Sequence, residues 1–197
     1  MRVFVTASDT GAGKTWLSEA LLRAWRCRGV KAFGVKATSC GGRADARRLV
    51  RASATGWTLA LADPVPLRRP AAPAAQPRPS WKTMVRRIQR SVRAARDAGA
   101  RVLLIEGAGG LLCPVDGRRT MREVASALDA RLLVVAPNRL GVLNQALLVL
   151  EAARAARLPV VALALNGGLR GAARPALRRS NARLLRLLAG VPVVEVK

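Results

Sequence analysis

The start of the chain carries a pattern that is typical of a phosphate-binding loop. An apolar strand-like run, Val3–Thr6, is followed by a turn rich in small residues and then by a helix-like segment from about Lys14. In such a turn, backbone N–H groups surround phosphate oxygens, and the N-terminus of the following helix adds a partial positive charge. The pattern therefore predicts a nucleotide-binding loop made of Asp9, Thr10, Gly11, Ala12, Gly13, Lys14 and Thr15.

Two side chains of this loop have expected chemical roles. Lys14 would reach the β- and γ-phosphates of a nucleotide, and the Thr15 hydroxyl would bind Mg²⁺. The strict pattern has glycine at position 8, where this chain has Ser8. The simpler alternative is a small-residue turn before a helix, which does not account for the adjacent lysine and threonine.

Lys36 and Asp45 follow a second strand-like run, Lys31–Val35. A lysine at the carboxyl end of a strand, beside a phosphate loop, can counter negative charge on a phosphoryl group in transfer. Asp45 could bind Mg²⁺ directly or through water, since this ion favours one or two carboxylates together with phosphates. Two simpler interpretations remain open: an ordinary surface lysine, and an aspartate that caps the helix beginning at Ala46.

A third candidate group closes the apolar run Arg101–Glu106. Glu106 is an acid at the end of a strand, where nucleotide hydrolases keep the second carboxylate of their metal site. The glycines that follow, Gly107 and Gly109 among them, let the backbone approach a ligand closely. A strand-ending turn would explain the glycines but not the acid in a buried strand.

The chain contains no histidine, which excludes every mechanism that needs a histidine base or metal ligand. Its three cysteines, Cys27, Cys40 and Cys113, include no C-x-x-C pair, which argues against a disulfide scaffold or a zinc site. Cys40 lies near the predicted site. Without a histidine base, it is interpreted as a small loop residue rather than as a nucleophile.

The candidate residues all lie just after strand-like runs that alternate with helix-like segments. Further apolar runs occupy residues 131–136, 160–165 and 191–194. This alternation predicts an α/β fold: a doubly wound, mostly parallel sheet in three αβα layers, like that of P-loop NTPases. Ligands of such sheets bind beyond the carboxyl ends of the strands. We expect a single domain over residues 1–197, with the proline-rich segment 63–79 as an ordered loop across its top.

The composition is globular, with a large excess of positive charge. The chain has 35 Lys and Arg against 11 Asp and Glu, a formal net charge of +24, and 51% hydrophobic residues. Aromatic residues make up only 3%, which leaves little for a base-stacking surface. We therefore expect a solvated arginine-rich surface and neither a specific nucleic-acid partner nor a membrane partner. The arginines of the helix-like segments would lie opposite apolar faces formed by Val85, Ile88 and Val92, and by Leu177, Leu184 and Leu188.

A resemblance to the dethiobiotin synthetase family is carried by Thr6–Thr15, Lys36, Asp45, Glu106–Gly110 and Leu140–Asn144, within a match from Arg2 to about Gly168. Members of this family are ATP-dependent ligases of biotin biosynthesis. The resemblance implies a cytoplasmic, homodimeric enzyme with Mg²⁺ as cofactor and ATP as co-substrate. Its reaction would carboxylate 7,8-diaminononanoate with CO₂ and close the ring to dethiobiotin, through a carbamate and a carbamic–phosphoric anhydride.

The resemblance also implies roles for residues around the nucleotide. Lys36 stands where the family has a lysine that contacts the carbamate and the phosphate, and with Lys14 it would serve catalysis. The metal positions of the family match Thr15, Asp45 and Glu106. Asn166, which closes the run Leu163–Leu165, resembles the asparagine that reads adenine.

On the substrate side, the resemblance implies contacts at Cys40, Gly107, Gly109 and Asn144. Asn144 resembles a residue at a helix start that meets the substrate carboxylate across the homodimer interface. The chain departs from the family pattern at Cys40, usually Ser or Thr, at Ala74, where the family has His, and at Gln145, also usually His.

Two other functions remain as alternatives. One is a relative that is non-catalytic or acts on an altered substrate, because the departures from the family pattern remove side chains that would contact the substrate. The other is a regulatory ATPase of the partition or septum-positioning type, which shares the fold. Such ATPases carry a second lysine early in the loop, and Ser8-Asp9-Thr10 offers none.

Overall fold

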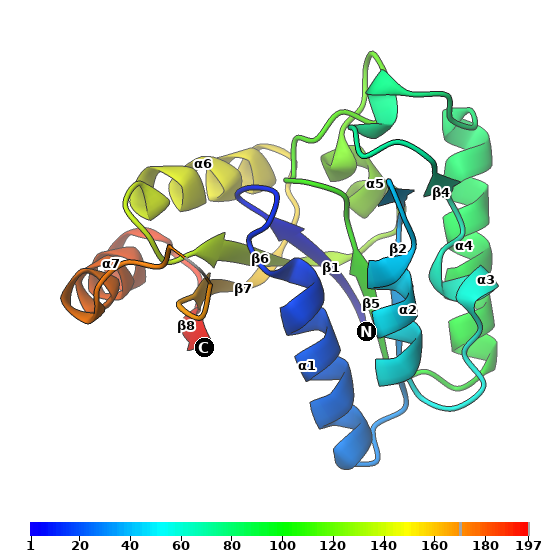
Figure 1. Cartoon of the computed structure of the whole chain (residues 1–197), viewed down its shortest axis with the longest axis horizontal. Helices are drawn as coiled ribbons and strands as arrows, with labels where there is room; N and C mark the ends of the chain where they lie inside the picture. The colour runs from blue at the N-terminus through cyan, green and yellow to red at the C-terminus, as the bar shows by residue number, and fades with distance from the viewer. Residues whose placement is uncertain (170, 197) are drawn as a thin grey trace.

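A parallel sheet forms the centre of the computed structural model, which describes residues 1–169 and 171–196 (Figure 1). Its strands are β1 (Arg2–Ala7), β2 (Ala32–Lys36), β5 (Val102–Glu106), β6 (Arg131–Pro137), β7 (Val160–Asn166) and β8 (Val193–Val196). They lie in the order β2-β5-β1-β6-β7-β8, and all neighbours are parallel. Because the chain extends the sheet on both sides of β1, the predicted doubly wound α/β fold is confirmed.

Helices cover both faces of this sheet. They are α1 (Lys14–Cys27), α2 (Ala44–Ala52), α3 (Leu59–Ala62), α4 (Trp81–Asp97), α5 (Met121–Ala127), α6 (Val142–Ala155) and α7 (Pro175–Leu188). Successive side chains of a strand point to opposite faces. Val3 and Val5 therefore pack in one buried cluster with α1 and α2, whereas Phe4 packs in a second cluster with α4 and α6.

Residues 70–73 of the proline-rich segment lie near the carboxyl ends of β2 and β5. The segment contains β4 (Pro66–Leu67), which pairs with β3 (Ser39–Cys40), and a 3-10 turn at Pro73–Ala75; the sequence predicted none of these short elements. The Gln76 side chain holds the loop together, because it accepts from the N–H of Arg69 and donates to the carbonyls of Arg69 and Ala71, all at 2.9 Å.

The buried face of α7 differs from the predicted one. Leu177, Leu184 and Leu188 are 37%, 39% and 55% exposed, so the prediction of a core face at these positions is wrong. The neighbouring stripe with Asn181 and Leu185 is buried instead. Asn181 donates to Asn138 Oδ1 at 2.9 Å, a hydrogen bond to the loop after β6 that fits this rotation of the helix.

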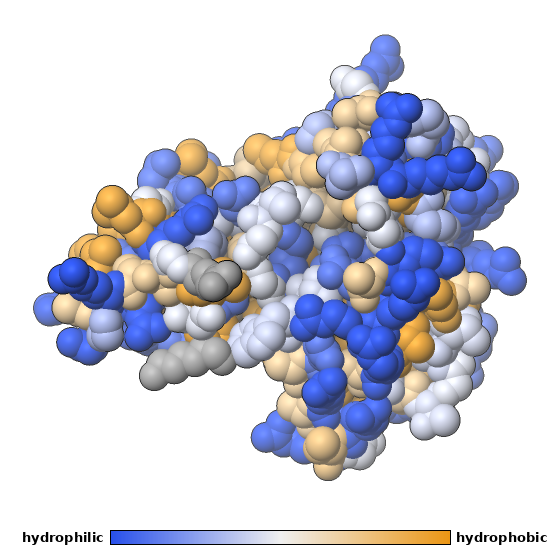
Figure 2. All heavy atoms as spheres, viewed as in Figure 1, coloured by the Kyte–Doolittle hydropathy of each residue, from blue (hydrophilic) through white to orange (hydrophobic). Residues whose placement is uncertain are grey.

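Charged and polar side chains dominate much of the surface, as the arginine count predicts. Figure 2 shows hydrophilic residues over large parts of one face, with apolar patches among them. On α4 the inner face is buried at Met84, Ile88 and Ala95, and the arginines lie outside it. Within residues 1–169 and 171–196, no helix has the length and apolar character needed to cross a membrane.

Candidate functional site

A cavity of about 550 Å³ opens at the carboxyl ends of β1, β2 and β5. Four structural parts line it: the loop from β1 to α1, the first turns of α1 and α2, the ends of β2 and β5 with the turns that follow them, and the proline-rich loop. We call it the site cavity. Its polar and charged lining residues include Thr10, Lys14, Thr15, Lys36, Thr38, Ser39, Asp45, Arg48 and Glu106.

The loop between β1 and α1 brings Lys14 into the site cavity. Gly13 adopts a left-handed backbone conformation with φ 92°, and α1 begins at the next residue. Lys14 is buried, and its Nζ lies 3.5 Å from the Asp9 carbonyl oxygen. The lysine is thus folded back over its own loop, where phosphate oxygens bind in P-loop proteins.

Lys36 joins the two acidic residues of the site. Lys36 and Glu106 are register partners at the ends of the adjacent parallel strands β2 and β5. The Lys36 ammonium lies 2.5 Å from Glu106 Oε1 and 2.9 Å from Asp45 Oδ2. Glu106 is fully buried and Lys36 nearly so, which excludes the interpretation of Lys36 as a surface lysine. Asp45 lies in the first turn of α2 rather than before it, so it is not the N-cap residue, which is Arg43.

The environment shifts the protonation of these groups in different directions. Burial lowers the pKa of the Lys14 ammonium, and the nearby charge of Lys36 lowers it further. Burial alone would also lower the pKa of Lys36, but the carboxylates of Glu106 and Asp45 outweigh it and raise that pKa. Burial would raise the pKa of Asp45, yet Lys36 holds it below its usual value. Lys36 and Asp45 therefore remain a charged pair at neutral pH.

The oxygen atoms around Thr15 fit a magnesium ion that is bound together with a nucleotide. Glu106 Oε1 accepts from Thr15 Oγ1 at 2.7 Å and from Lys36, whereas Glu106 Oε2 is buried without a hydrogen-bond partner. A buried carboxylate oxygen without a partner is costly, and a cation would satisfy it. In the described part of the chain, no three His, Cys, Asp or Glu side chains form a metal site by themselves. Phosphate and water oxygens would therefore have to complete the magnesium coordination.

Asn166 lies at the end of β7, and its amide group is bonded within the protein. Its Nδ2 donates to the Ala12 carbonyl at 3.2 Å, and its Oδ1 accepts from the Gly168 N–H at 3.0 Å. A Cβ atom at Gly13 would clash with this Nδ2, and the backbone there is left-handed, so any other residue would be strained. Asn166 thus holds the phosphate loop against β7, and its contact with adenine stays a prediction.

The predicted substrate residues divide into two groups. Cys40 and Gly109 line the site cavity, whereas Gly107 and Asn144 lie outside its lining. A Cβ at Gly107 would meet the Phe4 ring at 2.8 Å, so this glycine is required by packing in the core. Asn144 is exposed in the first turn of α6.

Several lining residues were not among the sequence candidates. Trp16 and Arg48 line the mouth beside Thr15 and Asp45, and Pro70–Pro73 and Cys113 form the opposite wall. Helical spacing was a signal for Arg48, because a residue three positions after Asp45 lies one turn further along the same face of α2. The sequence predicts a loop over residues 63–79 but gives no signal for which of its residues, or for Cys113, line the cavity, because irregular segments determine those positions.

Comparison with known proteins places the chain among dethiobiotin synthetases. A protein-family model described as an AAA domain matches residues 1–196. The "ATP-dependent dethiobiotin synthetase BioD" of Anaeromyxobacter dehalogenans (strain 2CP-C) is 40% identical over 170 residues, which cover 83% of this chain and 75% of that protein. The protein of the same name from Akkermansia muciniphila is 32% identical over 167 residues, or 84% of this chain and 78% of its own.

Solved structures share the fold at low identity. The signal recognition particle receptor FtsY from Elizabethkingia anophelis aligns with a TM-score of 0.59 and 22% identity, over 98% of this chain and 56% of that chain. The 54 kDa protein of the signal recognition particle from Aeropyrum pernix K1, in complex with GDP, aligns with a TM-score of 0.60 and 16% identity, over 99% of this chain and 41% of that chain. At such identities the likeness concerns the fold alone. From the sequence relatives, in contrast, we conclude that the chain belongs to the dethiobiotin synthetase family of P-loop proteins.

Proposed function

We propose that this protein is an ATP-dependent dethiobiotin synthetase, which carboxylates 7,8-diaminononanoate with CO₂ and closes the ureido ring. The observation that carries the proposal is the placement of Lys36. Its ammonium bridges Glu106 and Asp45 beside the phosphate loop, in a cavity large enough for a small substrate.

In this proposal, ATP binds with its phosphates on the loop of residues 9–15. Lys14 contacts the β- and γ-phosphates, and the backbone N–H groups at the start of α1 surround their oxygens. Thr15, Asp45 and Glu106 would hold Mg²⁺, which would neutralise charge on the phosphates. Lys36 faces the transferring phosphoryl group from the end of β2 and steadies the carbamate.

The reaction then needs no side-chain nucleophile, which suits a chain without histidine or tyrosine. The N7 amine of the substrate adds to CO₂ and releases a proton to solvent, which gives a carbamate. A carbamate oxygen attacks the γ-phosphorus, the bond to the β–γ bridging oxygen breaks, and ADP leaves. The N8 amine attacks the carbonyl carbon of the resulting anhydride and loses a proton to solvent, and phosphate departs as the ring closes. The protein contributes positioning and charge stabilisation.

The proposal includes a homodimer in which Asn144 completes the site of the partner subunit. Three large apolar side chains near α6 support an interface there, since Leu112, Leu140 and Leu148 are 53%, 83% and 61% exposed. A pocket of about 270 Å³ lies between Leu112 and Leu148. Exposed apolar groups gathered on one surface mark interaction sites, and Asn144 lies on the same part of α6.

Mixing two inactive variants tests this shared site. Lys36→Ala and Asn144→Ala each disable both sites of their own homodimer. In a heterodimer, however, one site keeps both residues if Asn144 acts across the interface, so an equal mixture recovers about a quarter of wild-type activity. No recovery, with subunit exchange demonstrated by mass spectrometry, would show that Asn144 acts within its own subunit.

A cytoplasmic location is part of the proposal, because Cys27, Cys40 and Cys113 are all free thiols, as is usual in a reducing compartment. The activity itself is tested with purified protein, 7,8-diaminononanoate, bicarbonate and Mg·ATP, with dethiobiotin detected by mass spectrometry. Product formation supports the proposal. ATP turnover that DNA or lipid stimulates and the diamine does not affect would instead indicate a regulatory ATPase. Nucleotide binding without product would indicate a relative with another substrate.

A further inference from the structure

The helices α1 and α2 lie side by side and carry two of the three proposed magnesium ligands. Thr15 is in the first turn of α1 and Asp45 in the first turn of α2. Thr15 lies close enough to Asp45 to contribute to its lowered pKa, so the two first turns meet at the site cavity. Whatever fixes the separation and register of these helices also fixes this pair of ligands.

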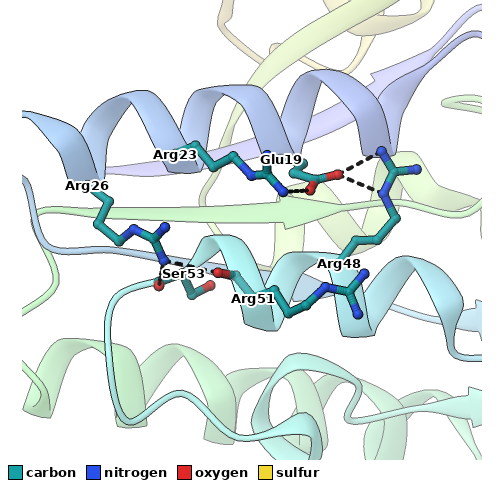
Figure 3. A network of polar contacts seen from close by, with 6 residues as sticks. All are labelled: Glu19, Arg23, Arg26, Arg48, Arg51 and Ser53. Atoms are coloured by element: carbon teal, nitrogen blue, oxygen red, sulfur yellow. Dashed lines mark hydrogen bonds and ion pairs between the residues drawn. The ribbon is translucent and has the colours of Figure 1, made fainter.

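One turn further along, Glu19 and Arg48 connect the same two faces. Glu19 follows Thr15 by four residues and Arg48 follows Asp45 by three, which places each one turn away on the same side of its helix. Arg48 donates through Nε to Glu19 Oε2 at 2.7 Å, and its Nη2 lies at the same distance. Figure 3 shows this two-nitrogen contact and the remaining nitrogen of Arg48 pointing away from Glu19.

The contact is better defined than a typical surface ion pair. The Glu19 side chain is only 13% exposed and Arg48 is 36% exposed, so water competes little for the carboxylate. Arg48 Nε and Nη2 both reach the same oxygen, Glu19 Oε2, while Arg23 donates to Oε1, so both oxygens of this carboxylate are held. Arg48 itself lines the site cavity next to Thr15 and Asp45.

We propose that Glu19 and Arg48 are positioning residues for the magnesium site, because their contact sets the distance between Thr15 on α1 and Asp45 on α2. The inference rests on the magnesium site proposed above. Neither residue contacts the ion. Each of the two residues holds one turn of its helix in place. The preceding turn, which carries Thr15 or Asp45, then presents its oxygen ligand to the same point.

The chain offers two matched controls. Arg23 also pairs with Glu19, but from α1 itself and with a 60% exposed side chain, so it does not link the helices. Arg26 does link them, at the far end from the site, since it donates to the Arg51 carbonyl at 3.0 Å and to that of Ser53 at 3.5 Å (Figure 3). Arg23→Ala removes a charge pair without loosening α2, and Arg26→Ala loosens the helix pair away from the metal ligands.

The test measures binding of Mn²⁺, as a stand-in for Mg²⁺, in the presence of ADP, from the electron paramagnetic resonance signal of the free ion. We expect Arg48→Ala and Glu19→Gln each to raise the Mn²⁺ dissociation constant about 10-fold, as loss of groups that orient metal ligands does. The double variant should bind no more weakly than Arg48→Ala alone, because both changes remove one contact. Arg23→Ala and Arg26→Ala should stay within about twofold of wild type, as expected for exposed or distant contacts.

Two results would overturn the inference. One is wild-type Mn²⁺ affinity in a folded Arg48→Ala or Glu19→Gln protein, with folding checked by circular dichroism and Tm. The other is an equal loss of Mn²⁺ affinity in Arg26→Ala. That result would mean that any loosening of the two helices weakens binding, wherever it occurs. If the wild-type protein does not bind Mn²⁺ with ADP, the proposed magnesium site itself is refuted. Failure of the positioning role and failure of the site are therefore distinguishable.

Discussion

Lys36 and Glu106 are directly opposed in the register of β2 and β5, and their charged atoms meet at 2.5 Å. Both side chains are nearly or fully buried. A buried pair of this kind is stable only while each charge has its partner, since an isolated buried charge costs several kcal/mol. The pair therefore links the stability of the sheet edge to the charge balance of the site, and four predictions concern this site and its surroundings.

Replacing Lys14 with alanine should abolish turnover and leave the fold intact. The variant loses the ammonium that contacts the terminal phosphates, but its backbone keeps the loop conformation set by Gly13. Calorimetric titration with ATP should show a loss of affinity of more than about 10-fold, which corresponds to roughly 1.4 kcal/mol. Lys31→Ala, at an exposed position before β2, is the matched control and should bind as wild type does. Wild-type turnover in Lys14→Ala would refute the assignment of the loop.

Replacing Lys36 with alanine should depress kcat far more than it weakens ATP binding. Its charge acts on the transferring group rather than on the bound nucleotide, and such a loss appears mainly in kcat. The variant also leaves Glu106 without its ammonium, so its Tm should fall, and Mg²⁺ should raise that Tm more than it raises the wild-type value. Steady-state kinetics check the fall in kcat. Thermal unfolding with and without Mg²⁺ checks the lower Tm and its larger rise with the ion. An equal collapse of ATP affinity would make Lys36 a nucleotide ligand only.

Replacing Cys40 with serine should preserve or increase activity toward the diamine. Burial raises the pKa of the Cys40 thiol, so it remains protonated, and a thiol is a weaker hydrogen-bond donor than a hydroxyl. The variant restores the residue type usual in the family. We expect kcat/KM for the diamine to be equal or higher, with Cys27→Ser, at an exposed position in α1, unchanged. A marked loss in Cys40→Ser alone would mean that the site is not of the synthetase kind.

Replacing Glu123 with glutamine should destabilise the protein at neutral pH and much less in acid. Thr120 donates to Glu123 Oε2 from its N–H at 2.6 Å and from its hydroxyl at 2.8 Å, at the start of α5. Burial would raise the pKa of Glu123, but these hydrogen bonds outweigh it and lower that pKa from its ordinary value of 4.5. This stabilisation is therefore present above pH 4.5 and is lost as the pH falls through the lowered value.

Thermal unfolding across pH measures this effect. At pH 7 the loss should be about 0.5–1 kcal/mol, typical of one contact at a helix N-terminus. The difference from wild type should shrink below pH 4.5. Glu151→Gln, in an exposed pair with Arg154, should show little change at any pH. A constant difference down to pH 3 would mean that the carboxylate charge plays no part in the cap.

The sheet and the centre of the site followed from the sequence, because both depend on local pattern. Continuous apolar runs such as Val102–Ile105 predict buried parallel strands, and residues that end such strands must gather at one edge. Lys36 and Glu106 meet for that reason. The exposed leucines of α7 show the limit: Leu177 and Leu185 lie on neighbouring stripes of the same helix, and tertiary contacts, among them the hydrogen bond from Asn181 to Asn138, place the stripe of Leu185 in the core.

The rest of the site depends on irregular turns and on contacts between segments apart in the sequence. Cys113 approaches Gly109 because the turn after β5 folds back, and Pro70 packs against Gly41 across the cavity mouth. Neither contact has a local signature. The role of Asn166 is implied by resemblance alone, and no local pattern predicts its hydrogen bond to Ala12, because it joins the end of β7 to the phosphate loop, 154 residues away in the sequence.

The rigidity of the proline-rich loop, which forms one wall of the site cavity, has a kinetic consequence. Pro70 and Pro73 each restrict their own φ angle, and the three hydrogen bonds of Gln76 hold the residues between Arg69 and Ala71. The wall thus has little freedom left to lose when a small molecule enters. Binding of the diamine should then require no slow rearrangement of this wall before the chemistry begins.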